Sequence, residues 1–82
     1  MQPQDKDGRR LINGDIVRWP NGKFEKVWGQ EWENCDLGWV LFLDGIWKIK
    51  IASYKNPDQY ITLESVQNTV MFVGHAKDVV IG

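Results

Sequence analysis

The chain has 82 residues, of which 43% are hydrophobic and 26% are charged, and its formal net charge is −1. This length allows one hydrophobic core, so we expect a single domain over residues 1–82. The near-neutral charge argues against a protein that binds duplex DNA mainly by neutralising phosphates, and it is too small for a mimic of DNA. Cys35 is the single cysteine, which excludes an intrachain disulfide.

Residues 1–8 are polar, and we expect them to form a flexible N-terminal segment. They contain no apolar stretch of the kind that a signal peptide needs. The longest apolar run, residues 39–43, is far shorter than the ~20 residues of a membrane helix. Together with the lone cysteine, these features favour a cytoplasmic protein that does not associate with a membrane.

Residues 15–19 form the first predicted strand. Residues 20–23 (Pro-Asn-Gly-Lys) have the composition of a turn, because proline presets φ and Asn-Gly tolerates positive φ. We therefore predict a hairpin there, with residues 24–29 returning antiparallel to the first strand. Residues 30–37 break the alternation of apolar and polar positions, so we expect a loop that is exposed at its tip.

The next predicted strand is the continuous apolar run of residues 38–43. Residues 44–45 (Asp-Gly) are the clearest hairpin signal in the chain, because apolar residues flank them on both sides. Residues 46–51 alternate strictly between apolar and polar side chains, which predicts a half-buried strand. This alternation places Trp47 in the core and the two lysines of the strand in solvent.

The last third of the chain continues the pattern of short strands. Residues 52–59 are a predicted loop, residues 60–63 a weak strand, residues 64–68 a single 3₁₀ or helical turn, and residues 69–74 the final strand. The tail, residues 75–82, fits an edge strand and a helical turn equally well. Since no segment sustains helical periodicity over three turns, we predict a mainly β fold. The expected architecture is a small antiparallel SH3-like barrel with at most a short helical turn near the C-terminus.

Two segments, one near each end of the chain, follow a family pattern. Residues 5–19 read Asp-Lys-Asp-Gly-Arg-Arg-Leu-Ile-Asn-Gly-Asp-Ile-Val-Arg-Trp, and residues 70–78 read Val-Met-Phe-Val-Gly-His-Ala-Lys-Asp. Both resemble the YopX family of small phage and prophage proteins, although His75 replaces the usual asparagine and no proline follows Asp78. The resemblance implies a YopX-like β domain in the cytoplasm of a bacterial host. It transfers no enzymatic activity and no functional residue.

The sequence offers little material for catalysis or metal binding. One cysteine and one histidine, Cys35 and His75, cannot supply the ligands of a tetrahedral zinc site. They form the one available nucleophilic pair, but a lone cysteine is commonly an inert, partly buried residue. No glycine-rich phosphate cradle leads into a helix. We therefore expect no enzyme, no cofactor and no metal site.

Five tryptophans exceed what the core of an 82-residue chain needs, and they favour a binding function. Our main hypothesis is an accessory protein that binds another protein. Trp32 would be the anchor, and Glu31 and Glu33 would belong to its polar rim. The partner is unidentified, and a homo-oligomer is left open. The simpler interpretation is that Trp32 caps an open end of the barrel.

The alternative hypothesis is a nucleic-acid-binding barrel. Lys48 and Lys50 project from one strand face, and Lys55 and Arg18 would complete a basic patch beside an exposed tryptophan. An ordinary solvated strand face explains the same residues. Salt distinguishes the two functions, because phosphate-driven binding weakens steeply as salt rises and an aromatic protein interface weakens only slightly.

Overall fold

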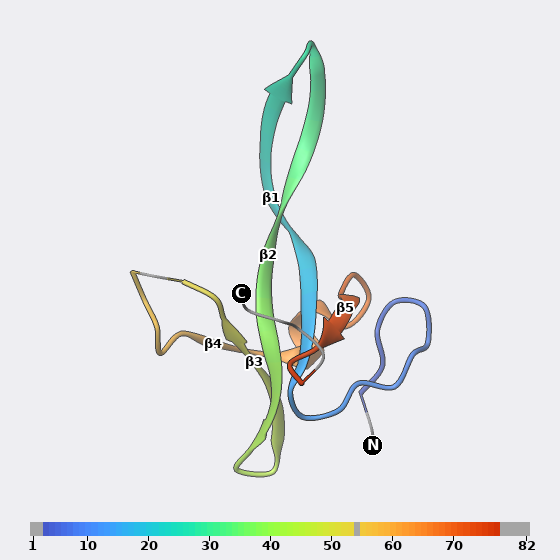
Figure 1. Ribbon diagram of the computed structural model, residues 1–82, viewed down its shortest axis with the longest axis vertical. Helices are drawn as coiled ribbons and strands as arrows, with labels where there is room; N and C mark the ends of the chain where they lie inside the picture. Colours follow the sequence, from blue (N-terminus) through green and yellow to red (C-terminus); the bar gives the residue numbers. More distant parts are fainter. Residues whose placement is uncertain (1–2, 54, 78–82) are drawn as a thin grey trace.

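The computed structural model describes residues 3–53 and 55–77. Their secondary structure comprises, in chain order, β1 (Asp15–Val27), β2 (Gln30–Leu43), β3 (Ile46–Ile51), β4 (Tyr60–Thr62), the 3₁₀ turn η1 (Leu63–Val66) and β5 (Met71–His75). The strands form one antiparallel sheet in the order β4-β3-β2-β1-β5 (Figure 1). The predicted mainly β fold with one short helical turn is therefore confirmed for these residues.

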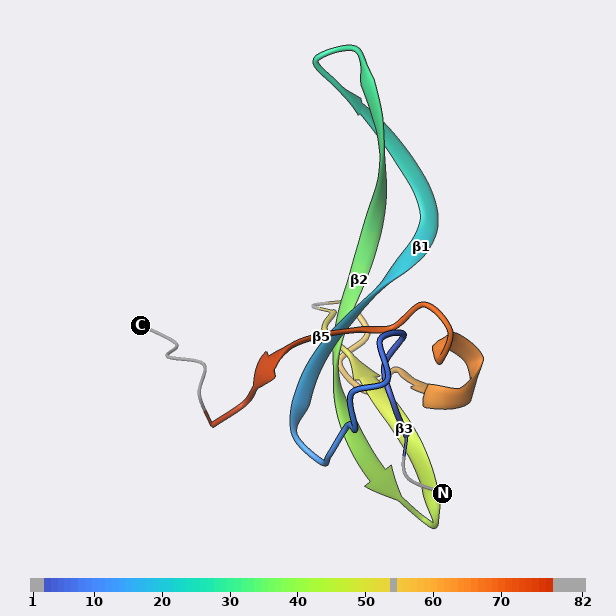
Figure 2. The same ribbon diagram turned by 90° about the vertical axis from the view of Figure 1, so that its right-hand side faces the viewer.

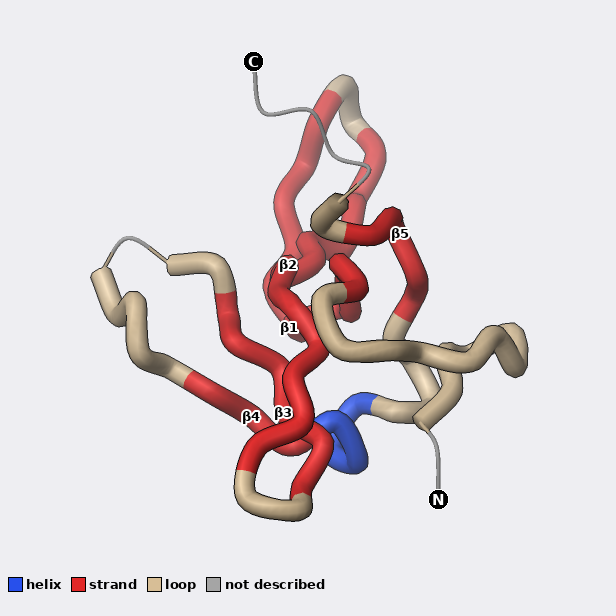
Figure 3. The backbone as a smooth tube through the Cα atoms, turned by 60° about the horizontal axis from the view of Figure 1, so that its bottom comes forward, coloured by secondary structure: helices blue, strands red, loops and turns tan. Residues whose placement is uncertain are grey.

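The sheet order brings the first and last strands together. β1 to β4 form a meander, and the chain then passes through η1 (blue in Figure 3) before β5 pairs with the outer edge of β1. Asp15 lies opposite His75, and Arg18 lies opposite Met71. In this order β4 and β5 lie at the two edges of the sheet. Residues 78–82, which belong to the ambiguous tail, lie outside the described residues.

The core lies on one face of the sheet. Its buried side chains come from β1, β2, β3, η1 and the segments that precede β1 and β5. They are Leu11, Val17, Trp19, Val40, Ile49, Leu63 and Val70. Because the contributing segments are far apart in the sequence, the hydrophobic cluster ties the two ends of the chain to the central strands.

The hairpin predicted at residues 20–23 is wrong, because β1 continues through them to Val27. Pro20 pairs with Cys35, and Phe24 pairs with Glu33, so three residues of β1 lie opposite one residue of β2. The turn-forming residues therefore make an enlarged β-bulge, which bends a strand without reversing it.

Side chains stabilise this bulge. The Asn21 side chain donates a hydrogen bond from Nδ2 to Asp36 Oδ1 (3.1 Å), and its Oδ1 accepts the backbone N–H of Lys23 (2.9 Å). Gly22 has a φ of 78°, a conformation that favours glycine. The Asn-Gly pair thus has the conformational role that the sequence suggested, but in a bulge.

The loop predicted at residues 30–37 is also wrong, because these residues form the first half of β2. Their partners lie in the second half of β1, and both strands project beyond the core there. With solvent on both faces, neither face needs apolar side chains. The alternation that identifies half-buried strands is therefore absent.

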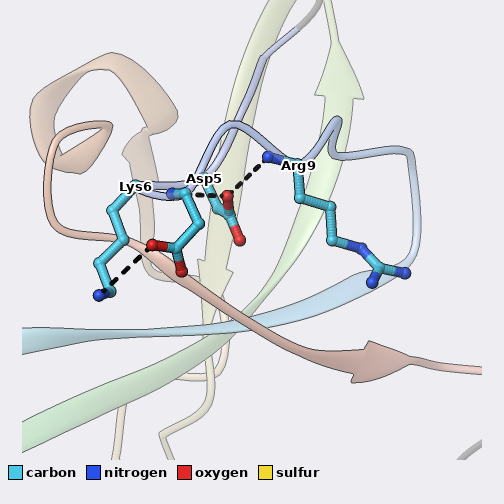
Figure 4. A network of polar contacts seen from close by, with 4 residues as sticks. Asp5, Lys6 and Arg9 are labelled. Atoms are coloured by element: carbon cyan, nitrogen blue, oxygen red, sulfur yellow. Dashed lines mark hydrogen bonds and ion pairs between the residues drawn. The ribbon is translucent and has the colours of Figure 1, made fainter.

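The described part of the N-terminal segment, predicted to be flexible, is hydrogen-bonded to itself and to the rest of the protein. Asp5 is buried, and its Oδ1 accepts the backbone N–H groups of Asp7 (2.9 Å) and Arg9 (2.8 Å) (Figure 4). The backbone N–H of Lys6 donates to the carbonyl oxygen of Val70 (2.9 Å). A polar composition suggests a flexible segment because little apolar surface is available to hold it. Here hydrogen bonds hold the segment in place instead.

A second buried carboxylate, Asp15, links the start of β1 to the end of β5. Its Oδ2 accepts the backbone N–H of Ile12 (2.9 Å), and its Oδ1 lies 2.8 Å from His75 Nδ1. Gly14 has a φ of 96°, and a β-carbon there would lie 3.1 Å from the His75 ring. The polar residues of the N-terminal pattern thus have structural roles in this fold.

The hairpin at Asp44 and Gly45 is confirmed, with positive φ values of 53° and 77° between β2 and β3. Beside it, the Trp47 ring stacks on Phe42, with ring centroids 4.8 Å apart. Trp47 is partly buried and packs against the core cluster from its edge, so its predicted place within the core is corrected.

Because part of its surface already contacts water, Trp47→Ala is expected to reduce the free energy of unfolding by about 2 kcal/mol, less than the 3–5 kcal/mol typical of a fully buried tryptophan. Urea denaturation measures this loss. Trp47→Phe preserves an aromatic pair with Phe42 and should lose less than about 1.5 kcal/mol. A loss from Trp47→Ala as large as that of a buried tryptophan would contradict the assignment to the edge.

Candidate functional site

The distal half of the β1–β2 hairpin projects from the rest of the molecule (Figures 1 and 2). We call this part, residues 24–33, the ribbon; its strands are paired from Phe24 opposite Glu33 to Val27 opposite Gln30. The ribbon contributes to the elongated shape of the molecule, whose extents are 44 × 29 × 24 Å. A two-stranded hairpin is only marginally stable alone in water. The ribbon also exposes apolar side chains, and exposed apolar patches commonly mark interaction sites.

The tip of the ribbon is a two-residue turn formed by Trp28 and Gly29. Their φ values of 56° and 77° are both positive, as in the type I′ turns that favour asparagine followed by glycine. The Trp28 side chain is 98% exposed. A bulky residue in this left-handed region stores strain on the order of 1 kcal/mol. A strained and fully exposed indole therefore marks a candidate functional residue.

The residues predicted to bind a protein all lie in the ribbon, but not on one face. Trp32, 57% exposed, is opposite Glu25 on one face. Glu31 and Glu33 lie on the other face, since side chains alternate along β2. A partner that covers Trp32 from its own face would therefore not meet both glutamates in the same plane, and the predicted polar rim is divided between the two faces.

The exposed apolar residues of the ribbon are distributed over both faces and the tip. They are Phe24, Val27, Trp28 and Trp32. The ribbon also contains one lysine and three glutamates, which gives it a net charge of −2. Phosphate groups are repelled by such a surface, whereas an apolar protein groove with a basic rim fits it.

The residues predicted to bind nucleic acid are arranged differently. Three of them, Arg18, Lys48 and Lys50, lie on the sheet face opposite the core, which we call the outer face. Lys55 lies beyond β3, in the loop that leads to β4. Trp32 belongs to the opposite side of β2, so it does not accompany these cations.

The aromatic residues of the outer face are Trp39 and Tyr60. Lys50 pairs with Trp39 on one side and with Tyr60 on the other, so the three side chains form a row across β2, β3 and β4. Trp39 is 37% exposed and Tyr60 is 40% exposed. The strict alternation of residues 46–51 predicts that Lys48 and Lys50 share one face. It does not predict which residues of β2 and β4 lie beside them, because that depends on strand register.

Trp28 is the residue that sequence reasoning missed. The turn predicted at residues 20–23 places it in the returning strand, residues 24–29. The signal that identifies it is the glycine at position 29, which is flanked by two segments of similar length that pair symmetrically around it. That symmetry becomes visible only once residues 30–37 are accepted as a strand.

The fold and these surfaces define a small antiparallel β protein with a projecting ribbon and a basic, aromatic sheet face. No family model, curated protein or solved structure matches the chain. Within residues 3–53 and 55–77, no three His, Cys, Asp or Glu side chains gather closely enough to hold a metal ion. The same residues contain no helix long and apolar enough to cross a membrane. The YopX resemblance stays a prediction.

Proposed function

We propose that the protein is a phage- or prophage-derived accessory protein that binds another protein through the ribbon and carries out no catalysis. The observation that supports this function is the position of Trp28, fully exposed in a strained turn at the end of a projecting hairpin. A side chain in that position contributes nothing to the core. The strained backbone and exposed indole of Trp28 cost the free protein stability, and burial of the indole against a partner would offset that cost.

The expected gain on binding is large enough to favour this explanation. Burying an indole removes about 150–250 Å² of surface from water, which corresponds to roughly 4–6 kcal/mol before the entropic costs of association. Tryptophan is also among the residues most enriched at the energetic centres of protein interfaces. Val27 and Trp32 extend the apolar surface behind the tip on one face of the ribbon, and Phe24 lies on the other face.

The substitution Trp28→Asn separates binding from folding. Asparagine before glycine is the preferred pair of a type I′ turn, so we expect the free energy of unfolding to rise by about 0.5–1 kcal/mol. Capture of the protein partner should be lost. The measurement is affinity capture from a bacterial host lysate, treated with nuclease and washed at raised salt, alongside urea denaturation of the purified variant.

Tyr60→Ala is the matched control, because it removes an exposed aromatic residue outside the ribbon and should leave capture unchanged. Equal capture by the natural chain and by Trp28→Asn would overturn the proposal, as would capture that disappears with nuclease. Light scattering covers the case of a homo-oligomer: a partner that is a second copy would appear as a doubled mass, which Trp28→Asn would return to that of the monomer.

A further inference from the structure

The outer face carries three cations, and the carboxylates on the same side of β2, Glu31 and Glu33, lie in the ribbon beyond the bulge. Arg18, Lys48 and Lys50 lie on it, on β1 and β3. Outside the ribbon, the acidic residues of the five strands are Asp15 and Asp36. Both belong to the other side of their strands: Asp15 is buried against His75, and Asp36 accepts a hydrogen bond from Asn21. The outer face is therefore a local positive surface on a protein whose net charge is −1.

A hollow adjoins these cations where the sheet meets the loop after β3. Its volume is about 400 Å³, and the residues that line it are Trp39, Lys50, Ile51, Ala52, Ser53 and Pro57. This volume lies in the lower part of the range of about 300–1,000 Å³ that is typical of small-ligand sites. An indole wall beside an ammonium group combines a stacking surface with a partner for a phosphate.

From this juxtaposition we propose that the outer face binds single-stranded nucleic acid. One base stacks on Trp39 in the hollow, and Lys50 pairs with the adjoining phosphate. Arg18 and Lys48 pair with neighbouring phosphates along the same face. Stacking on aromatic side chains in a positively charged groove is the general mechanism of single-strand recognition. This surface is separate from the ribbon, so the proposal goes beyond protein binding.

Charge and stacking together select this occupant over three others. A second copy seated face to face would bring three cations against three, and like charges across an interface are costly. In an acidic peptide the charged residues carry no ring, whereas each phosphate of a single strand is accompanied by a base that can stack on Trp39. Duplex DNA hides its base faces, and three cations give it too little phosphate neutralisation for tight binding.

The test uses a fluorescein-labelled oligothymidylate of about 12 nucleotides, within the usual range of single-strand site sizes. Fluorescence anisotropy is measured with the full chain over a range of salt concentrations. Because each neutralised phosphate of a single strand contributes about −0.7 to the slope of log K against log salt, three cations predict a slope of about −2. Lys50→Ala should reduce the slope to about −1.4 and weaken binding at low salt.

Trp39→Leu tests the stacking and keeps an apolar side chain on the sheet. It should weaken binding about 10-fold and leave the salt slope unchanged, because no charge is removed. If Trp39→Leu does not fold, Trp39→Phe provides a milder truncation of the same stacking surface, which should weaken binding by a smaller factor and also leave the salt slope unchanged. Lys26→Ala is the control for charge, since it removes one lysine from the ribbon and should alter neither affinity nor slope.

Four results would overturn the proposal: no binding at low salt, tighter binding of the corresponding duplex, equal competition by polyglutamate, or equal weakening by Lys26→Ala and Lys50→Ala. Trp28→Asn should bind the oligonucleotide as the natural chain does. A failure of the nucleic-acid proposal is therefore distinguishable from a failure of the protein-binding proposal.

Discussion

Replacing Gly38 with alanine is expected to lower the free energy of unfolding by about 3 kcal/mol. Gly38 is buried in the middle of β2, and a β-carbon there would lie 2.5 Å from Ile49 Cγ2 and 2.6 Å from the carbonyl oxygen of Lys50. The carbonyl oxygen belongs to the backbone of β3, so it cannot move without distorting the central strand pair. The indole of Trp19 closes the third side, with Cη2 at 3.2 Å from the same position.

Urea denaturation monitored by circular dichroism measures this loss. Leu37→Ala is the control, because Leu37 is the neighbouring residue on the exposed side of β2 and should cost less than about 1 kcal/mol. Combining Gly38→Ala with Trp19→Phe should give less than the sum of the two losses, since the smaller ring frees one wall of the site. An unchanged midpoint for Gly38→Ala would show that the strands do not approach so closely.

Trp19→Ala is expected to cost about 3–5 kcal/mol, the range for truncating a large buried aromatic residue. The Trp19 side chain comes from β1, is 4% exposed and belongs to the core cluster. A chain of this size has a total stability near the lower end of about 5–15 kcal/mol. The variant should therefore be largely unfolded at moderate temperature, with a flattened thermal transition.

Trp28→Ala is the matched control, since it removes the same side chain from a position where 98% of it is exposed. Its effect on the free energy of unfolding should stay within about 0.5 kcal/mol of zero. Because both variants replace tryptophan with alanine, the difference between their losses of stability reports the effect of burial alone. Similar losses for both would mean that the ribbon contributes to the stability of the core, contrary to the arrangement described above.

The two proposed surfaces differ in charge as well as in position. The ribbon has a net charge of −2, and the outer face has three cations on β1 and β3. This separation explains how a protein with a net charge of −1 can offer a surface to phosphates at all. It also means that the two partners, if both bind, do not compete for the same residues.

Local sequence determined those elements whose signal lies within a few residues. The strict alternation of residues 46–51 produced β3 with the predicted bounds, and Asp44 and Gly45 formed the predicted hairpin with positive φ values. The short turn near the C-terminus was also predicted, and it is η1. In each case the residue types restrict the backbone directly, through φ preferences or through a half-buried period of two.

Tertiary structure decided where the long hairpin turns and which residues share a surface. Residues 20–23 are compatible with both a turn and a bulge, and the hydrogen bonds that Asn21 and Gly22 donate to the carboxylates of the facing strand, Asp36 and Glu33, favour the bulge. Because β1 continues through the bulge to Val27, the chain reverses at Trp28 and Gly29, and the ribbon extends beyond the core. The row of Trp39, Lys50 and Tyr60 likewise depends on the register of three strands. Such choices are made by contacts between residues distant in the chain, so no local pattern records them.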